Sequence, residues 1–180
     1  MKKGVQLNKE DIKKIIKFTL KEKEIINTLK LPEEVFLPLI FSVRFGGDWS
    51  VKKNFKKLMS VKEKITKYDS KKKIGYTLEI IYLFVNPILL KEEGKVYRME
   101  KCGNKNQREL VERPYSVVVN GNYILKAILN PKDMKIAIKH VKGPLVFSGS
   151  AAYGSSHEIE HLANDDIKGI PFWDFEYVLE

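Results

Sequence analysis

Apolar residues recur with the period of a helix in the first part of the chain. Isoleucine and leucine repeat at helical spacing up to about Leu31, behind a capping residue at Asn8 and in front of Pro32. A second segment, over residues 33–45, stops at Gly46-Gly47. The pattern therefore predicts one helix over residues 8–31 and another over 33–45.

The middle of the chain has the residue types of strands. Residues 76–85 read YTLEIIYLFV and are closed by Asn86-Pro87, which predicts a buried strand followed by a turn. Asn120-Gly121 and Asn130-Pro131 predict two further turns. The other expected strands cover residues 89–90 continuing into 96–99, 115–119, 123–129, 135–140 and 145–147.

One more helix is expected near the end of the chain. Ser148 or Ser150 can cap it, and it runs through AAYGSSHEIEHLA to about Asn164. Helices, then antiparallel strands, then an inward-facing helix make an α+β fold. With 180 residues and 43% hydrophobic residues, we expect a single domain over 1–180, of which 1–75 is a helical part without recognisable motifs.

Charge and targeting signals bear on the expected cellular location and binding partners of the protein. Residues 1–14 are too polar for a signal peptide, and the longest apolar run, 35–41, is too short for a membrane span, so a cytoplasmic protein without a membrane partner is expected. The net charge is +10, with lysine clusters at 52–57 and 71–73. Such clusters are most often solvated faces, but they also favour phosphate-rich partners, including the ribosome.

The stretch GSSHEIEHLA contains a His-Glu-x-x-His motif. On a helix, His157 and His161 lie one turn apart and can present two imidazoles to one metal ion. Glu158 is rotated by about 100° from His157, so it suits proton transfer from a metal-bound water rather than ligation. The alternative is an exposed acidic helix face on which the histidines pair with Glu158 and Glu160.

A third ligand would favour the metal site over an exposed face. Cys102 is the only cysteine, at the end of an expected strand and next to a glycine. His140 reads as a strand or turn histidine, and the carboxylates after the helix read as an exposed turn. The candidates are Cys102, His140, Asp165, Asp166 and Asp174.

With Cys102 added, the chain resembles the peptide deformylase family. That family binds its metal through one Cys in Glu-Gly-Cys-Leu-Ser and two His in His-Glu-x-Asp-His. Four local matches follow the family's order and cover about the last 100 residues: FVNPILL at 84–90, MEKCGN at 99–104 with RELVERPYSVVV at 108–119, SHEIEHL at 156–162, and GIPFWDF at 169–175.

The resemblance implies roles for particular residues. Glu158 is the catalytic acid/base, the N–H of Gly103 helps to hold the developing oxyanion, and Arg108 pairs with the peptide backbone of the substrate. The resemblance implies Fe²⁺, readily replaced by Zn²⁺, and mixed thiolate and imidazole ligands also accept Ni²⁺ or Co²⁺. The implied metal ligands are Cys102, His157 and His161.

Helix geometry adds the walls of a substrate pocket. Ser150, Tyr153 and Gly154 precede His157 by one or two turns on its face, and Glu100 would sit beside them. The family's Gly-x-Gly-Leu-Ala-Ala-x-Gln loop, which supplies an oxyanion glutamine, is not found. RFGGDW at 44–49 is the nearest glycine-rich piece in the right order.

Three functions follow from these residues. The first is a metal-dependent hydrolase with a deformylase-like fold, which removes the N-formyl group from the N-terminal methionine of peptides or nascent chains. The second is another metal-dependent amide or peptide hydrolase. The third is a catalytically silent binding protein associated with the ribosome or RNA through its lysine surface.

Overall fold

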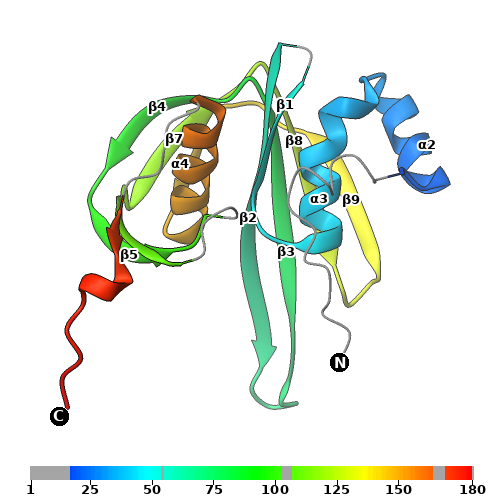
Figure 1. The fold of residues 1–180 in the computed structure, drawn as a ribbon. Helices are drawn as coiled ribbons and strands as arrows, with labels where there is room; N and C mark the ends of the chain where they lie inside the picture. The colour runs from blue at the N-terminus through cyan, green and yellow to red at the C-terminus, as the bar shows by residue number, and fades with distance from the viewer. Residues whose placement is uncertain (1–16, 54, 103–106, 164–168, 180) are drawn as a thin grey trace, which may run out of the picture.

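The structure is a computed structural model that describes residues 17–53, 55–102, 107–163 and 169–179 (Figure 1). Its first helix is α2 (Leu20–Leu29), which begins behind a capping box formed by Thr19 and Glu22. The expected continuous helix over 8–31 is therefore wrong, because the chain is not helical at Phe18 and Thr19. The apolar period runs across this cap, so periodicity could not reveal the break; residues 8–16 lie outside the described residues.

The second helical segment confirms the prediction for 33–45. A 3-10 turn, η1 (Glu33–Phe36), leads into α3 (Leu37–Phe45). Pro38 is tolerated because it lies in the first turn of α3, and Gly46 ends the helix with a φ of 72°. Among the helices that the structure describes, none is long and apolar enough to cross a bilayer.

A five-stranded antiparallel sheet forms the centre of the molecule. Its order is β1-β2-β3-β8-β9, with β1 (Trp49–Lys53), β2 (Lys56–Asp69), β3 (Ile74–Val85), β8 (Tyr123–Asn130) and β9 (Lys135–His140). The expectation that 1–75 is helical is therefore wrong for β1 and β2. The outer half of β2 is exposed and rich in lysine, so it lacks the apolar alternation that reveals a strand; its pairing with β3 holds it.

Both faces of this sheet are covered, which explains the unbroken apolar run in β3. Ile81, Leu83 and Val85 pack with α3, whereas the alternate residues Ile80, Tyr82 and Phe84 pack with the helix near the end of the chain. That helix, α4 (Ser150–Ala163), lies between the sheet and strands β4 and β7 (Figure 1). The mixed helix and antiparallel sheet agree with the expected α+β class.

Two three-stranded antiparallel sheets complete the fold. One has the order β10-β7-β4, with β10 (Leu145–Ser148), β7 (Ser116–Asn120) and β4 (Ile88–Glu93). The other has the order β11-β6-β5, with β11 (Ile170–Pro171), β6 (Glu109–Arg113) and β5 (Val96–Glu100). The strand expected from 89 into 99 is split between the two sheets, since the chain turns at Gly94 with a φ of 72°. Strands β6 and β11 were not expected from the sequence.

Small residues bring α4 close to the central sheet. Ala151, Ala152, Ser155 and Ser156 are all buried. The helix begins at Ser150 itself, behind Gly149 with a φ of 62°, while the hydroxyl of Ser148 hydrogen-bonds that of Ser116 on β7. This close seating fixes the direction in which the next turns of α4 present their polar side chains.

Candidate metal centre

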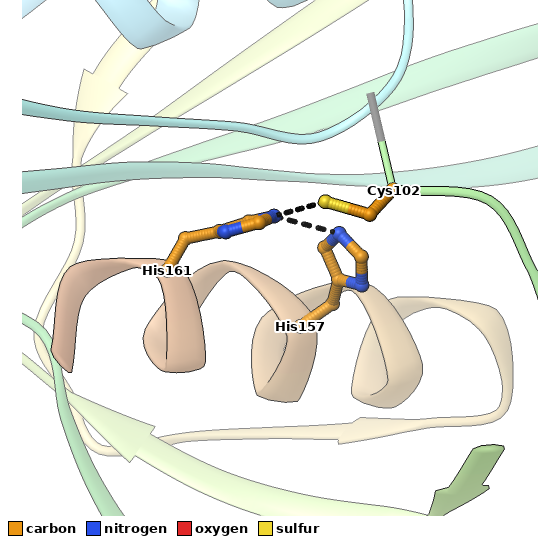
Figure 2. Close-up of side chains that lie close together, drawn as sticks. All are labelled: Cys102, His157 and His161. Carbon is orange, nitrogen blue, oxygen red and sulfur yellow. Dashed lines mark hydrogen bonds between the residues drawn. The ribbon is translucent and has the colours of Figure 1, made fainter. Parts of the chain in front are cut away.

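Three side chains that can ligate a metal converge above α4. Cys102 follows β5, and its thiol points towards the rings of His157 and His161, which rise from successive turns of the helix (Figure 2). Cys102 Sγ is 3.4 Å from His161 Nε2, and the two Nε2 atoms are 3.0 Å apart. The expected convergence of Cys102 with both histidines is confirmed.

These spacings suit one ion. Bonds of about 2.05 Å to nitrogen and 2.3 Å to sulfur in a tetrahedron place two nitrogens about 3.3 Å apart and a nitrogen and a sulfur about 3.6 Å apart. All three ligand atoms lie within 4.8 Å of one another, and their side chains are half-buried. Three protein ligands also leave a fourth position for water or substrate, as in catalytic sites.

A carboxylate orients His157 from behind. Glu100 Oε2 lies 3.0 Å from His157 Nδ1, so the ring donates there and keeps the Nε2 lone pair towards Cys102 and His161. Arg113, which is 2% exposed, holds Glu100 through Nε and Nη2 and reaches Glu160 at 2.6 Å through Nη1. Burial alone would raise the pKa of Glu100, but hydrogen bonds from His157 and Arg113 hold it at about 2.

The other ligand candidates lie elsewhere or are not described. His140 is on β9, where its ring packs on Tyr123 with 4.7 Å between the centroids. Asp174 is exposed in the turn η2 (Phe172–Asp174). Asp165, Asp166 and the expected oxyanion donor Gly103 lie outside the described residues.

A pocket of about 360 Å³ opens beside His157. The exposed acidic face considered as an alternative is wrong, because Glu158 is only 2% exposed and lies in the wall of this pocket. Arg108 is exposed, donates to the carbonyl of Met99 at 3.3 Å, and is not part of the wall formed by described residues. The four residues expected to form a pocket wall do line this pocket: Glu100, Ser150, Tyr153 and Gly154.

Sequence reasoning missed Asp48, which also lines the pocket. Its Oδ1 accepts the backbone N–H of Lys62 at 2.7 Å. Burial is the main cause that raises the pKa of Asp48 from 3.8 to about 6; the N–H of Lys62 opposes this, and the charge of Glu158 adds to it. The RFGGDW segment therefore reaches the site, although through its aspartate rather than through an amide.

Arg113 was missed as well, although it lies within the matched segment RELVERPYSVVV. An arginine that ends a strand directly before Pro114 reads as an exposed turn residue. Only the pairing of β5 with β6 shows that Arg113 and Glu100 meet beneath His157. Three more wall residues, Arg98, Met99 and Lys101, come from β5 and the residue that follows it.

Replacing Asp48 with asparagine is expected to stabilise the metal-free protein at pH 8 but not at pH 4. Asp48 ionises near pH 3.8 when unfolded and near pH 6 when folded, so its ionisation favours unfolding across that window. Above pH 6 the penalty is fully present and amounts to about 3 kcal/mol. Asparagine keeps an oxygen for the Lys62 N–H and removes this penalty.

Urea unfolding at both pH values measures this effect on the free energy of unfolding. If the free energy of unfolding of Asp48→Asn differed from that of the wild type by the same amount at pH 4 and at pH 8, the surroundings would not perturb the pKa of this carboxyl. Asp133→Asn, an exposed change in the turn between β8 and β9, is the matched control and should change little at either pH.

Comparison with known proteins gives no further information about this site. The chain matches none of the protein-family models, curated proteins or solved structures with which it was compared. Any assignment of function therefore rests on the side chains gathered around Cys102, His157 and His161.

Proposed function

We propose that the chain is a deformylase-like metallohydrolase that removes the N-formyl group from the N-terminal methionine of peptides. The observation that carries the proposal is the convergence of Cys102 with His157 and His161 beside a buried glutamate, Glu158. A ligand set with a free position, an adjacent acid/base and an open pocket are the parts that amide hydrolysis requires.

Different residues of the chain have different roles in the proposed hydrolysis. When bound, a divalent ion activates a water and polarises the carbonyl oxygen of the substrate. Glu158 takes a proton from the attacking water and passes it to the leaving nitrogen. Glu100 holds His157 in the ligating orientation, and Arg113 holds Glu100. Fe²⁺ or Zn²⁺ fits the thiolate and imidazole set, and Ni²⁺ or Co²⁺ would also be accepted.

The substrate would lie in the pocket along α4. Arg98 stacks on Tyr153 with its guanidinium carbon 4.7 Å from the ring centroid, so the ring holds a cation at the pocket wall. Arg98 and Lys101 offer donors to the carbonyl groups of a bound peptide, a role that the resemblance gives to Arg108. Tyr153 and Met99 offer apolar surface for the first side chain.

Nascent chains in the cytoplasm are the proposed source of such substrates, and the ribosome is the proposed docking partner. The outer half of the hairpin formed by β2 and β3 extends beyond the helices (Figure 1), and its β2 strand and turn are exposed. It carries Lys64, Lys67 and the turn residues Lys71, Lys72 and Lys73. A projecting basic hairpin can contact phosphates of ribosomal RNA without blocking the pocket.

Release of formate from formyl-Met-Ala-Ser tests the proposed reaction. The protein, purified anaerobically and loaded with Fe²⁺ or Zn²⁺, should release formate, and acetyl-Met-Ala-Ser should not be cleaved at the same rate. Cleavage of acetylated or free peptides instead would point to another amide hydrolase. If metal-loaded protein cleaves none of these peptides, the proposal fails.

Turnover should be slow while inhibition by a peptide hydroxamate stays tight. The described wall includes the carboxyl of Asp48 but no glutamine, and loss of one oxyanion donor lowers the rate by about 100- to 1000-fold. A hydroxamate gains most of its affinity from the ion itself, so it tolerates this loss. Both values are measured on one metal-loaded sample, and rapid turnover would contradict this view of the pocket.

A further inference from the structure

Asp48 is held firmly at the edge of the pocket. It follows Gly46 and Gly47, which both have positive φ, of 72° and 74°. The hydroxyl of Ser42 donates to the carbonyl of Gly47 at 2.7 Å, and the indole N–H of Trp49 donates to that of Gly46. These bonds on either side fix the backbone that carries the carboxylate.

Helix α4 has a glycine where the Asp48 carboxylate contacts it. A Cβ on Gly154 would lie 2.1 Å from Asp48 Oδ2, so any side chain at that position of α4 would displace Asp48. Among the residues that the structure describes, no lysine, arginine or histidine side chain lies within ion-pair distance of Asp48, although the charges of Lys62 and His157 act to lower its pKa. The charged group of Lys62 pairs with Glu79 instead, at 3.5 Å.

The proposed reaction produces a cation next to Asp48. Gly154 lies one turn before Glu158 on α4, so Asp48 borders the glutamate that protonates the leaving nitrogen. Hydrolysis breaks the bond between the formyl carbon and nitrogen: the formamide and one water give formate and a peptide with an α-ammonium group. The formamide is neutral, whereas the product carries a positive charge that a carboxylate binds.

We infer that Asp48 is an amine-binding residue of the pocket, which holds the free amino terminus of a peptide and hence the product of the reaction. The inference rests on the proposed function for the origin of that peptide, but the binding itself needs no turnover. It also makes Asp48 a specificity residue, since it distinguishes a charged amino terminus from a blocked one.

Calorimetric titration of metal-free and zinc-loaded protein with Met-Ala-Ser and acetyl-Met-Ala-Ser tests the inference. Wild type should bind the free tripeptide in both states. Asp48→Asn should weaken that binding about ten- to hundredfold, the range expected for a hydrogen bond to a charged group. The acetylated peptide should bind wild type and Asp48→Asn equally, and Asp133→Asn should bind the free peptide as wild type does.

Two results would overturn the inference. One is equal affinity of wild type and Asp48→Asn for Met-Ala-Ser, including no binding by either. The other is a second zinc ion per chain that Asp48→Asn loses, which would assign the carboxylate to a metal. Absence of formate release together with Asp48-dependent binding of the amine would remove the proposed reaction and leave the amine site standing.

Discussion

Replacing Glu158 with glutamine is expected to lower formate release by about 100- to 10,000-fold while metal content stays unchanged. Glu158 is 2% exposed and lies in the pocket wall one residue after His157, where it can exchange a proton with water and substrate. Glutamine has nearly the same shape but cannot take a proton. It should therefore remove acid/base catalysis without disturbing the helix.

Glu24→Gln supplies the matched control, because Glu24 is exposed on α2 and the change in charge is the same. Turnover and metal content are measured on the same preparations, so that loss of the ion is not mistaken for loss of the base. If Glu158→Gln retained wild-type turnover, another base would carry the reaction. If it lost the ion, Glu158 would be a ligand.

Replacing Arg113 with leucine is expected to lower the free energy of unfolding by about 3 to 5 kcal/mol. The change leaves Glu100, whose side chain is 10% exposed, without the arginine that holds it from two nitrogens. It also removes the partner of Glu160. A loss of this size is a large share of the stability of an ordinary domain.

Urea unfolding of metal-free protein measures the effect and separates it from metal binding. Arg108→Leu, at an exposed position near the same sheet, should change stability by no more than about 0.5 kcal/mol. The double variant Arg113→Leu with Glu100→Leu should lose less free energy of unfolding than the two single variants lose together. In the double variant, Glu100 no longer remains as a buried carboxylate without its arginine. Additive losses would mean that the two side chains do not interact.

The sequence predicted that His157 and His161 lie together because their spacing is local. His157 and His161 share a helix face through the helix period alone, and so do the wall positions Tyr153 and Gly154. Cys102 stood out as the only cysteine, at the end of an expected strand, and the resemblance joined it to the two histidines, since no period connects it with α4. Strand β3 could also be predicted from the sequence, because burial of both its faces leaves an unbroken apolar run.

What the sequence missed depends on pairing between distant segments. The exposed half of β2 has no apolar pattern, and only its register with β3 makes it a strand. Asp48 follows two glycines and reads as part of a turn until β1 places it against Gly154. Arg113 reads as a surface residue until β5 and β6 bring it to Glu100. Burial of a charged residue is a tertiary property that composition does not encode.

Metal content after anaerobic purification tests the central claim most directly. We predict about one Fe²⁺ or Zn²⁺ per chain in the wild type, with near-complete loss in Cys102→Ala and in His161→Ala. His140→Ala should keep the ion, because His140 lies on β9 against Tyr123. A wild-type protein that holds no ion and takes up neither Fe²⁺ nor Zn²⁺ under reducing conditions would contradict the claim, as would equal loss of metal in His140→Ala.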